Sequence, residues 1–92
     1  MTTVYRVFPD YSADPVWAVD GMVDLDELPI TDDLRDRLRA WNAEWEELVG
    51  VRTGRFRIID KDGHRRWKQS GRYLARNLER ELGPGVEIQY QP

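Results

Sequence analysis

Two stretches of this sequence repeat apolar residues at helical spacing, and each confines them to one side. At about 100° per residue, six apolar side chains between Thr31 and Gly50 share one narrow face: Leu34, Leu38, Trp41, Trp45, Leu48 and Val49. A second set follows: Trp67, Gly71, Leu74, Ala75, Leu78 and Leu82. A helix with one apolar face must bury it against another element, so the sequence predicts two helices packed on a common core.

The ends of both helices carry local signals. Thr31 is a favourable N-cap, and the acidic residues Asp32 and Asp33 follow it in the first turn. Gly50 can end this helix in a left-handed conformation, which predicts a helix from Asp32 to Val49. The second helix is predicted from about His64 to Leu82, because Asp62-Gly63 is typical of a turn and Gly83-Pro84-Gly85 stops a helix.

Strand-like segments lie at both ends of the sequence. Residues 3–8 and 86–90 are rich in β-branched and aromatic residues, and residues 16–19 form a shorter run that ends at Asp20-Gly21. Residues 22–30 are predicted as an acidic loop, and residues 51–63 as a loop that could contain a short strand. The predicted fold class is α+β, with a small sheet of terminal strands packed by a two-helix hairpin in the order β-(β)-α-α-β.

Length and composition limit the classes of protein to consider. The 92 residues suit one hydrophobic core and predict a single domain over residues 1–92. The sequence has no cysteine, which excludes disulfides, thiol nucleophiles and cysteine-ligated zinc. Neither a secretory signal pattern nor an apolar run long enough for a membrane span is visible, so we expect a cytoplasmic protein that needs no membrane.

Residues that could support catalysis are few. The single histidine, His64, stands beside Arg65 and Arg66, whose charges disfavour its protonated form. Asp60-Lys61-Asp62-Gly63 begins like a calcium-binding loop, but basic residues occupy the positions where further oxygen ligands belong. We therefore predict no enzyme activity, no metal site and no cofactor.

Charge is distributed unevenly along the sequence. Residues 1–50 contain 12 acidic and four basic residues, whereas residues 51–92 contain five acidic and 10 basic residues. The acidic half predicts a surface that binds a basic protein partner, with Asp20, Asp24, Asp26 and Glu27 at its centre. Its candidate extensions are Trp17, Glu44, Glu46 and Glu47.

A basic face on the second predicted helix supports an alternative. Its residues are Arg65, Lys68, Arg72, Arg76 and Arg80, with Tyr73 at the rim. Such a face could bind phosphates and stack a base, or it could be a solvated helix surface. The sequence pI of about 5.1 favours the solvated face.

The four tryptophans have two expected roles. Trp41, Trp45 and Trp67 lie on the apolar faces of the predicted helices, so we expect them to share one core. Trp17 lies in an extended segment just before the acidic loop, which makes it either a packed side chain or a contact for a partner.

Several of these features occur together in a recognisable order. Trp17 is followed by Leu28-Pro29-Ile30-Thr31 at a helix start, by Trp41 and Trp45, and by Leu78-Glu79-Arg80-Glu81-Leu82-Gly83 before the last strand. The chain thereby resembles a diffuse family of short bacterial proteins, some of which accompany toxin or defence systems as immunity-like partners. It departs from that family in the arginine-rich stretch from Arg52 to Arg66, and the resemblance assigns no functional residue.

The sequence thus leads to two hypotheses about function. The first is a non-enzymatic protein-binding module, of the kind of an immunity protein that inhibits a basic bacterial toxin through an acidic surface. The alternative is a nucleic-acid-binding protein that uses the basic face of the second helix.

Overall fold

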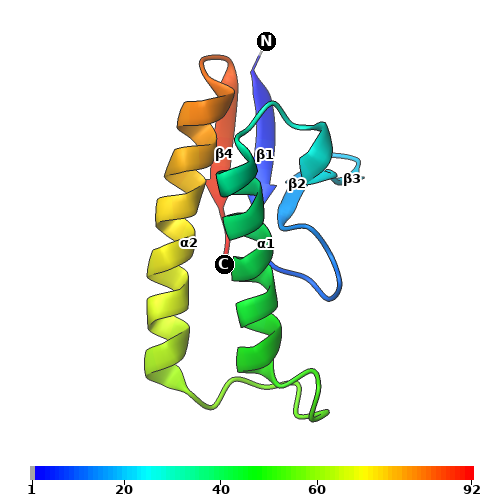
Figure 1. Ribbon diagram of the computed structural model, residues 1–92, viewed down its shortest axis with the longest axis vertical. Coiled ribbons are helices and arrows are strands. Elements are labelled where there is room, and N and C mark those ends of the chain that lie inside the picture. Colours follow the sequence, from blue (N-terminus) through cyan, green and yellow to red (C-terminus); the bar gives the residue numbers. More distant parts are fainter. Residues whose placement is uncertain (1) are drawn as a thin grey trace.

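The computed structural model describes residues 2–92, which form four strands, one short 3₁₀ helix and two long α-helices. Figure 1 shows the two long helices running side by side along the length of the molecule. In chain order the elements are β1 (Thr3–Val7), β2 (Val16–Ala18), β3 (Gly21–Met22), η1 (Leu25–Glu27), α1 (Asp32–Val49), α2 (Lys61–Leu82) and β4 (Val86–Tyr90). The predicted α+β class and the order β-(β)-α-α-β are confirmed.

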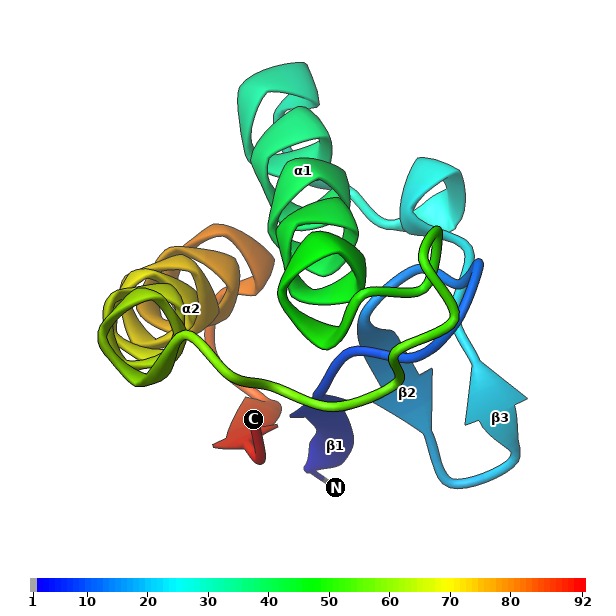
Figure 2. The ribbon, with the colours of Figure 1, turned by 90° about the horizontal axis from the view of Figure 1, so that it is seen from below.

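The four strands form one sheet in the order β3-β2-β1-β4. Strands β1 and β4 pair in parallel, whereas β2 pairs antiparallel with both β1 and β3. The helical hairpin carries the chain from the first three strands to β4, which lies on the free side of β1. Figure 2 shows both helices on one face of this sheet, while the other face carries no helix.

Alternation along the strands decides which side chains meet the helices. Val7 and Val16 are opposite each other in the register and are fully buried, and Tyr5, Ile88 and Tyr90 pack against the same core. The next residue along each strand points to the uncovered face. Arg6 of β1 and Trp17 of β2 are therefore neighbours on that face, because they are paired in the register.

Two stacked indole rings join the helices at the centre of the core. Trp41 of α1 and Trp67 of α2 are 1% and 3% exposed, and their rings are nearly parallel with centroids 4.4 Å apart. Each indole N–H donates to the backbone carbonyl oxygen of the other tryptophan, at 3.0 Å from Trp41 and 2.8 Å from Trp67. The pair thus buries two large aromatic groups and satisfies both of their polar atoms.

Trp45 packs against the core that contains Trp41 and Trp67 but does not join their stack, so the expectation of one core shared by all three tryptophans holds for Trp45 only in part. Trp45 is half-buried, and its ring lies 5.0 Å from that of Tyr11 in the segment that follows β1. It packs against the margin of the core. Trp45 follows Trp41 by four residues, so the two side chains share a face of α1 but lie one turn apart along it, and at that level Trp45 meets Tyr11 of the β1–β2 segment.

Helix α1 has the ends that its sequence predicts. The Thr31 hydroxyl accepts a hydrogen bond from the backbone N–H of Leu34 at 3.2 Å, and Gly50 ends the helix with a φ of 80°. Helix α2 begins three residues earlier than predicted, at Lys61. The Asp60 carboxylate accepts the N–H of Gly63 at 2.9 Å, so Asp62-Gly63 lies in the first helical turn and the predicted turn is wrong.

Two segments predicted as loops have more specific structures. Residues 22–30 contain the end of β3 and the η1 helix. Residues 51–60 form turns and no strand, and they fold back along the end of α1. Arg55 holds this fold, because its guanidinium donates to the carbonyl oxygens of Leu48 at 2.9 Å and Arg57 at 3.0 Å.

Candidate functional site: acidic groups around helix α1

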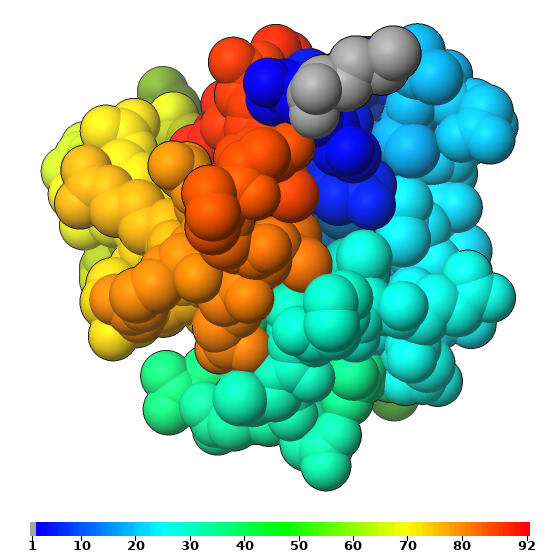
Figure 3. Space-filling view, turned by 90° about the horizontal axis from the view of Figure 1, so that it is seen from above, coloured from blue at the N-terminus to red at the C-terminus, as the bar shows by residue number. Residues whose placement is uncertain are grey.

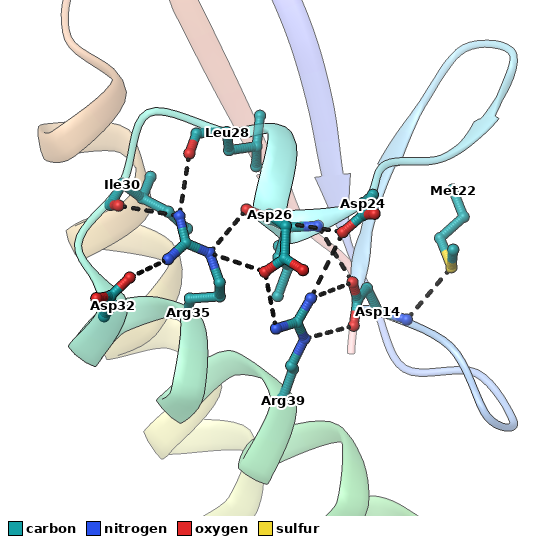
Figure 4. Close-up of polar contacts among 10 residues, drawn as sticks. Asp14, Met22, Asp24, Asp26, Leu28, Ile30, Asp32, Arg35 and Arg39 are labelled. Carbon is teal, nitrogen blue, oxygen red and sulfur yellow. Dashed lines mark hydrogen bonds and ion pairs between the residues drawn. The ribbon is translucent and has the colours of Figure 1, made fainter.

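The acidic loop, residues 22–30, and Asp14 of the β1–β2 segment lie against α1, where their carboxylates form ion pairs with Arg35 and Arg39 (Figure 4). The Arg39 guanidinium donates to both carboxylate oxygens of Asp14, each at 3.1 Å, and to Asp26 at 3.1 Å. Asp24 lies 3.5 Å from the same guanidinium. Parallel donation to both oxygens is the strongest geometry for such a pair.

Arg35 fixes the other end of the same loop. Its guanidinium donates to the carbonyl oxygens of Leu25 at 3.0 Å, Ile30 at 3.2 Å and Leu28 at 3.3 Å. It also forms ion pairs with Asp26 and Asp32. This side chain is only 14% exposed, so it ties three backbone carbonyl oxygens of the loop to α1 from a largely buried position.

These contacts change the negative charge that Asp14 and the acidic loop offer to a partner. The hydrogen bonds from Arg39, together with the N–H of Leu25, hold the pKa of Asp14 below its ordinary value although burial acts in the opposite direction. Asp24 and Asp26 remain exposed, but an arginine already balances part of their charge. The loop is therefore first a structural element that is held to α1 by ion pairs.

Replacing Arg39 with glutamine is expected to lower the free energy of unfolding at pH 7 by about 1 kcal/mol, because the Asp14 carboxylate loses its paired donors while partly exposed. Since the folded pKa of Asp14 lies below the unfolded value near 4, the contribution is full above about pH 4 and declines as the pH falls further. Urea melts at pH 7 and pH 3 measure this. Arg37→Gln, which breaks only the exposed pair with Asp33, is the control, and an equal loss in both variants would contradict the assignment.

A cleft lies between the C-terminal half of α1 and the N-terminal half of α2. It has a volume of about 700 Å³ and walls from Leu48, Trp67 and Ile59. Glu44 and Glu47 of α1 lie on its lining, and both are exposed. Glu44 forms no ion pair within residues 2–92, and Glu47 has only a 3.9 Å approach to Arg52 between two largely exposed side chains. Such a pair contributes little, so both carboxylates can bind a new partner.

Basic groups also border this cleft. Arg55 lines it, but its guanidinium is already engaged with backbone carbonyl oxygens of Leu48 and Arg57. Arg66 is exposed at the α2 side and forms no ion pair within residues 2–92. The cleft therefore combines an apolar floor with carboxylates from α1 and a guanidinium from α2.

The remaining predicted contact residues lie apart from the cleft. Trp17 is half-buried on the uncovered face of the sheet, where its ring stacks on Phe8 at 4.7 Å and its N–H donates to the Phe8 carbonyl oxygen at 3.2 Å. Asp20 is exposed in the turn between β2 and β3, and Glu27 is exposed at the end of η1. Glu46 accepts hydrogen bonds from the Ser12 N–H at 3.0 Å and the Asn42 amide at 3.3 Å.

The structure thus divides the predicted acidic surface into three places. Asp24, Asp26 and Glu27 belong to the acidic loop beside α1, Glu44 and Glu47 to the cleft, and Trp17 and Asp20 to the small strands. Glu46 is instead engaged by Ser12 and Asn42. Sequence reasoning missed Arg35 and Arg39, although their i,i+4 spacing on α1 directly after an acidic loop was a usable signal. It gave no signal for the cleft, whose lining comes from residues up to 26 positions apart.

The basic residues of α2 form a row on the outer side of that helix. Arg65, Lys68, Arg72, Tyr73, Arg76 and Arg80 are all exposed, as the sequence predicts. Arg65 lies 3.5 Å from Asp62, and Arg80 donates to Asn77. Lys68, Arg72 and Arg76 form no ion pair with any residue between 2 and 92.

His64 stacks on Trp67, with ring centroids 5.6 Å apart, at the start of α2. Burial, with a smaller effect of Lys68, lowers the pKa of this histidine. In the part of the chain that the structure describes, no three histidine or carboxylate side chains converge in a way that could hold a metal ion. Over the same residues, neither long helix is apolar enough to span a bilayer.

Comparison with known proteins gives one result that covers nearly the whole chain. The model of a family described as Serratia CdiI immunity protein-like matches residues 3–92. The match therefore extends over both helices and all four strands. No curated protein matches the chain.

Proposed function

The chain belongs to the Serratia CdiI immunity protein-like family, and from this premise we propose that it binds a bacterial toxin and inhibits it without catalysis. The proposed partner is a protein with a basic surface, and the proposed place of action is the bacterial cytoplasm. An inhibitor of this kind needs a stable surface that complements the toxin in shape and charge.

The availability of Glu44 and Glu47 beside an apolar cleft carries this proposal. A lysine or arginine of the toxin could lay its aliphatic stem along Leu48 and Trp67 and bring its charged end to these carboxylates. Partial burial in the cleft strengthens such a pair relative to one on an open surface.

The other predicted residues extend the surface in this proposal. Asp20 and Glu27 are exposed and supply long-range attraction for a basic partner. Asp24 and Asp26 contribute their remaining charge while Arg35 and Arg39 hold their loop in place. Trp17 offers a half-buried aromatic surface on the uncovered face of the sheet.

Growth protection tests the function. The immobilised chain is used to capture its partner from a lysate of the source cells, and the captured protein is identified and expressed in a host without the chain. We expect growth arrest with the captured protein alone and recovery when the chain is expressed with it. A captured protein that leaves growth unchanged, or arrest that the chain does not relieve, contradicts the proposal.

The double variant Glu44→Gln/Glu47→Gln is expected to raise the Kd for the captured toxin at least tenfold, because each lost charge pair at a partly desolvated site costs about 1–3 kcal/mol. Surface plasmon resonance measures this at two salt concentrations. The matched control, Asp33→Asn/Asp36→Asn, removes the same charge from exposed positions of the same helix outside the cleft. Equal weakening by both variants would indicate long-range attraction in place of binding at the cleft.

Nucleic-acid binding through the basic row of α2 remains the second candidate, since all six residues are exposed. If the chain binds nucleic acid in this way, the logarithm of its affinity is expected to fall linearly with the logarithm of the salt concentration, because phosphate contacts release counterions. A gel-shift series with a single-stranded oligonucleotide measures this. The absence of any shift at low salt would contradict this candidate.

A further inference from the structure

Strand β4 lies at one end of the sheet, and one of its edges is free. At its two ends the bonds to β1 run from the Thr3 N–H to the Gly85 carbonyl oxygen at 2.8 Å, and from the Gln91 N–H to the Val7 carbonyl oxygen at 2.9 Å. In a parallel pair successive residues direct their backbone groups to opposite sides. The N–H and C=O groups of Val86, Ile88 and Tyr90 therefore point away from β1, and no strand between residues 2 and 92 pairs with them.

A groove runs along this free edge, between β4 and the outer side of α2. It consists of three adjoining hollows of about 430, 310 and 320 Å³. The first reaches Val86, the second Ile88 and Tyr90, and the third Pro92. Arg76 lines both the first and the second hollow, and Arg72 both the second and the third, so the hollows follow one another along the strand. Figure 3 shows the end of α2 and the adjoining β4 together at the surface, in orange and red.

The wall that α2 contributes to this groove is strongly basic. Its charged residues are Arg65, Lys68, Arg72, Arg76, Arg80 and a single acid, Glu79. Arg72 is close enough to the edge strand to oppose the effect of burial, which raises the pKa of the Tyr90 phenol to about 12. Groove and free edge thus combine unpaired backbone groups with an excess of positive charge.

This combination favours one kind of occupant. A second copy of the chain that paired through β4 would bring its own basic row beside the first, and like charges at short range repel. A nucleic acid would use the positive charge, but it has no peptide groups to pair with the outward groups of Val86, Ile88 and Tyr90. An acidic polypeptide in extended form satisfies both the strand edge and the charge.

We propose that β4 and α2 form a docking site for an acidic extended segment of a protein partner, which adds to the sheet as a fifth strand beside β4. Every second side chain of the added strand faces the helices, as Val86, Ile88 and Tyr90 do. Acidic residues at alternate positions of the segment therefore meet Lys68, Arg72 and Arg76. A segment of about six residues spans the edge from Val86 to Pro92, since a strand rises by about 3.3 Å per residue.

This site shares no residue with the cleft that contains Glu44 and Glu47, so it is a second surface that does not depend on the proposed toxin contact. Its test uses a fluorescein-labelled heptapeptide, Glu-Val-Glu-Val-Glu-Val-Glu, blocked at both ends. We expect saturable binding in fluorescence anisotropy. We also expect hydrogen exchange at the Ile88 and Tyr90 amides, followed by NMR, to slow at least tenfold when the peptide is bound.

Two controls separate strand addition from simple charge attraction. A heptapeptide of the same sequence that is N-methylated at alternate residues keeps the charge but cannot pair with the edge, and we expect it to bind at least tenfold more weakly. The double variant Arg72→Gln/Arg76→Gln is expected to weaken binding of the unmodified peptide at least tenfold. Arg52→Gln/Arg57→Gln removes two charges from exposed positions of the 51–60 segment and should leave binding unchanged.

Three results would overturn the proposal. They are the absence of peptide binding at low salt, binding without slower exchange at Ile88 and Tyr90, and binding of a single-stranded oligonucleotide to the same arginines in the absence of peptide binding. The last result would assign the basic row to nucleic acid. Because neither the peptides nor Arg72→Gln/Arg76→Gln involve a residue that lines the cleft, failure of this test leaves the proposed toxin inhibition untouched.

Discussion

Replacing Trp41 with alanine is expected to lower the free energy of unfolding by about 3–5 kcal/mol and to leave the variant largely unfolded. Trp41 is 1% exposed, and its removal leaves a large cavity between the two helices. It also takes away the stacking partner of Trp67 and one of the two N–H to carbonyl bonds between the helices. Urea melts followed by far-ultraviolet circular dichroism measure the loss.

Trp45→Ala is the matched control, because it removes the same side chain one helical turn away. Trp45 is half-buried and contacts Tyr11 at the margin of the core, so the expected loss is about 1–2 kcal/mol. A larger loss for Trp45→Ala than for Trp41→Ala would contradict the assignment of the stacked pair as the centre of the core.

Gly71→Ala is expected to destabilise the protein by about 1–3 kcal/mol, although alanine is the better helix former by about 1 kcal/mol. A Cβ atom at position 71 would lie 2.5 Å from Cζ2 of Trp41 and would also meet the Tyr90 hydroxyl. Neither neighbour can move freely. The Trp41 ring is stacked and hydrogen-bonded, and the Tyr90 hydroxyl donates to the Lys68 carbonyl oxygen at 2.5 Å.

Ser70→Ala supplies the control for this substitution, since Ser70 is exposed at the preceding position of the same helix. It gains helix propensity without meeting a neighbour, so its stability should stay within about 0.5 kcal/mol of the wild type or rise slightly. If thermal melts showed Gly71→Ala to be as stable as Ser70→Ala, close packing of α2 on Trp41 and Tyr90 would be ruled out.

The parts of the fold that local signals determine could be predicted from the sequence. Helix α1 was predicted with the observed bounds, because an apolar period, a threonine N-cap and a terminal glycine agree there. The start of α2 was wrong by three residues. Asp60-Lys61-Asp62-Gly63 contains turn-forming residues that also suit a capped first helical turn, and only the Asp60 to Gly63 hydrogen bond decides between them.

The parts that depend on contacts between distant residues could not be predicted in detail. The sequence indicated that the terminal strands share a sheet, but the parallel pairing of β1 with β4 and its register follow from how the helical hairpin packs. Trp41 and Trp67 were predicted as core residues from periodicity alone. Their mutual hydrogen bonds require a spatial arrangement of two helices that no spacing along the chain encodes.

The candidate site shows the same division. The distribution of charged residues along the sequence shows that its first half is acidic, and the exposed carboxylates Glu44 and Glu47 lie in that half. The charge distribution does not show that Arg35 and Arg39 form ion pairs with Asp14, Asp24 and Asp26, because these pairs form between side chains that only the fold brings together. An acidic sequence segment is thus not equivalent to an unpaired acidic surface.

Hydrogen exchange followed by mass spectrometry, on the chain alone and with its captured toxin, tests most directly whether the cleft is the inhibitory surface. Residues 51–60 form turns over the open end of the two helices and should exchange quickly in the free chain. We predict that exchange slows in residues 44–66 when the toxin is bound, and that Glu44→Gln/Glu47→Gln removes this protection at the same toxin concentration. Toxin binding that leaves exchange in residues 44–66 unchanged would contradict the account.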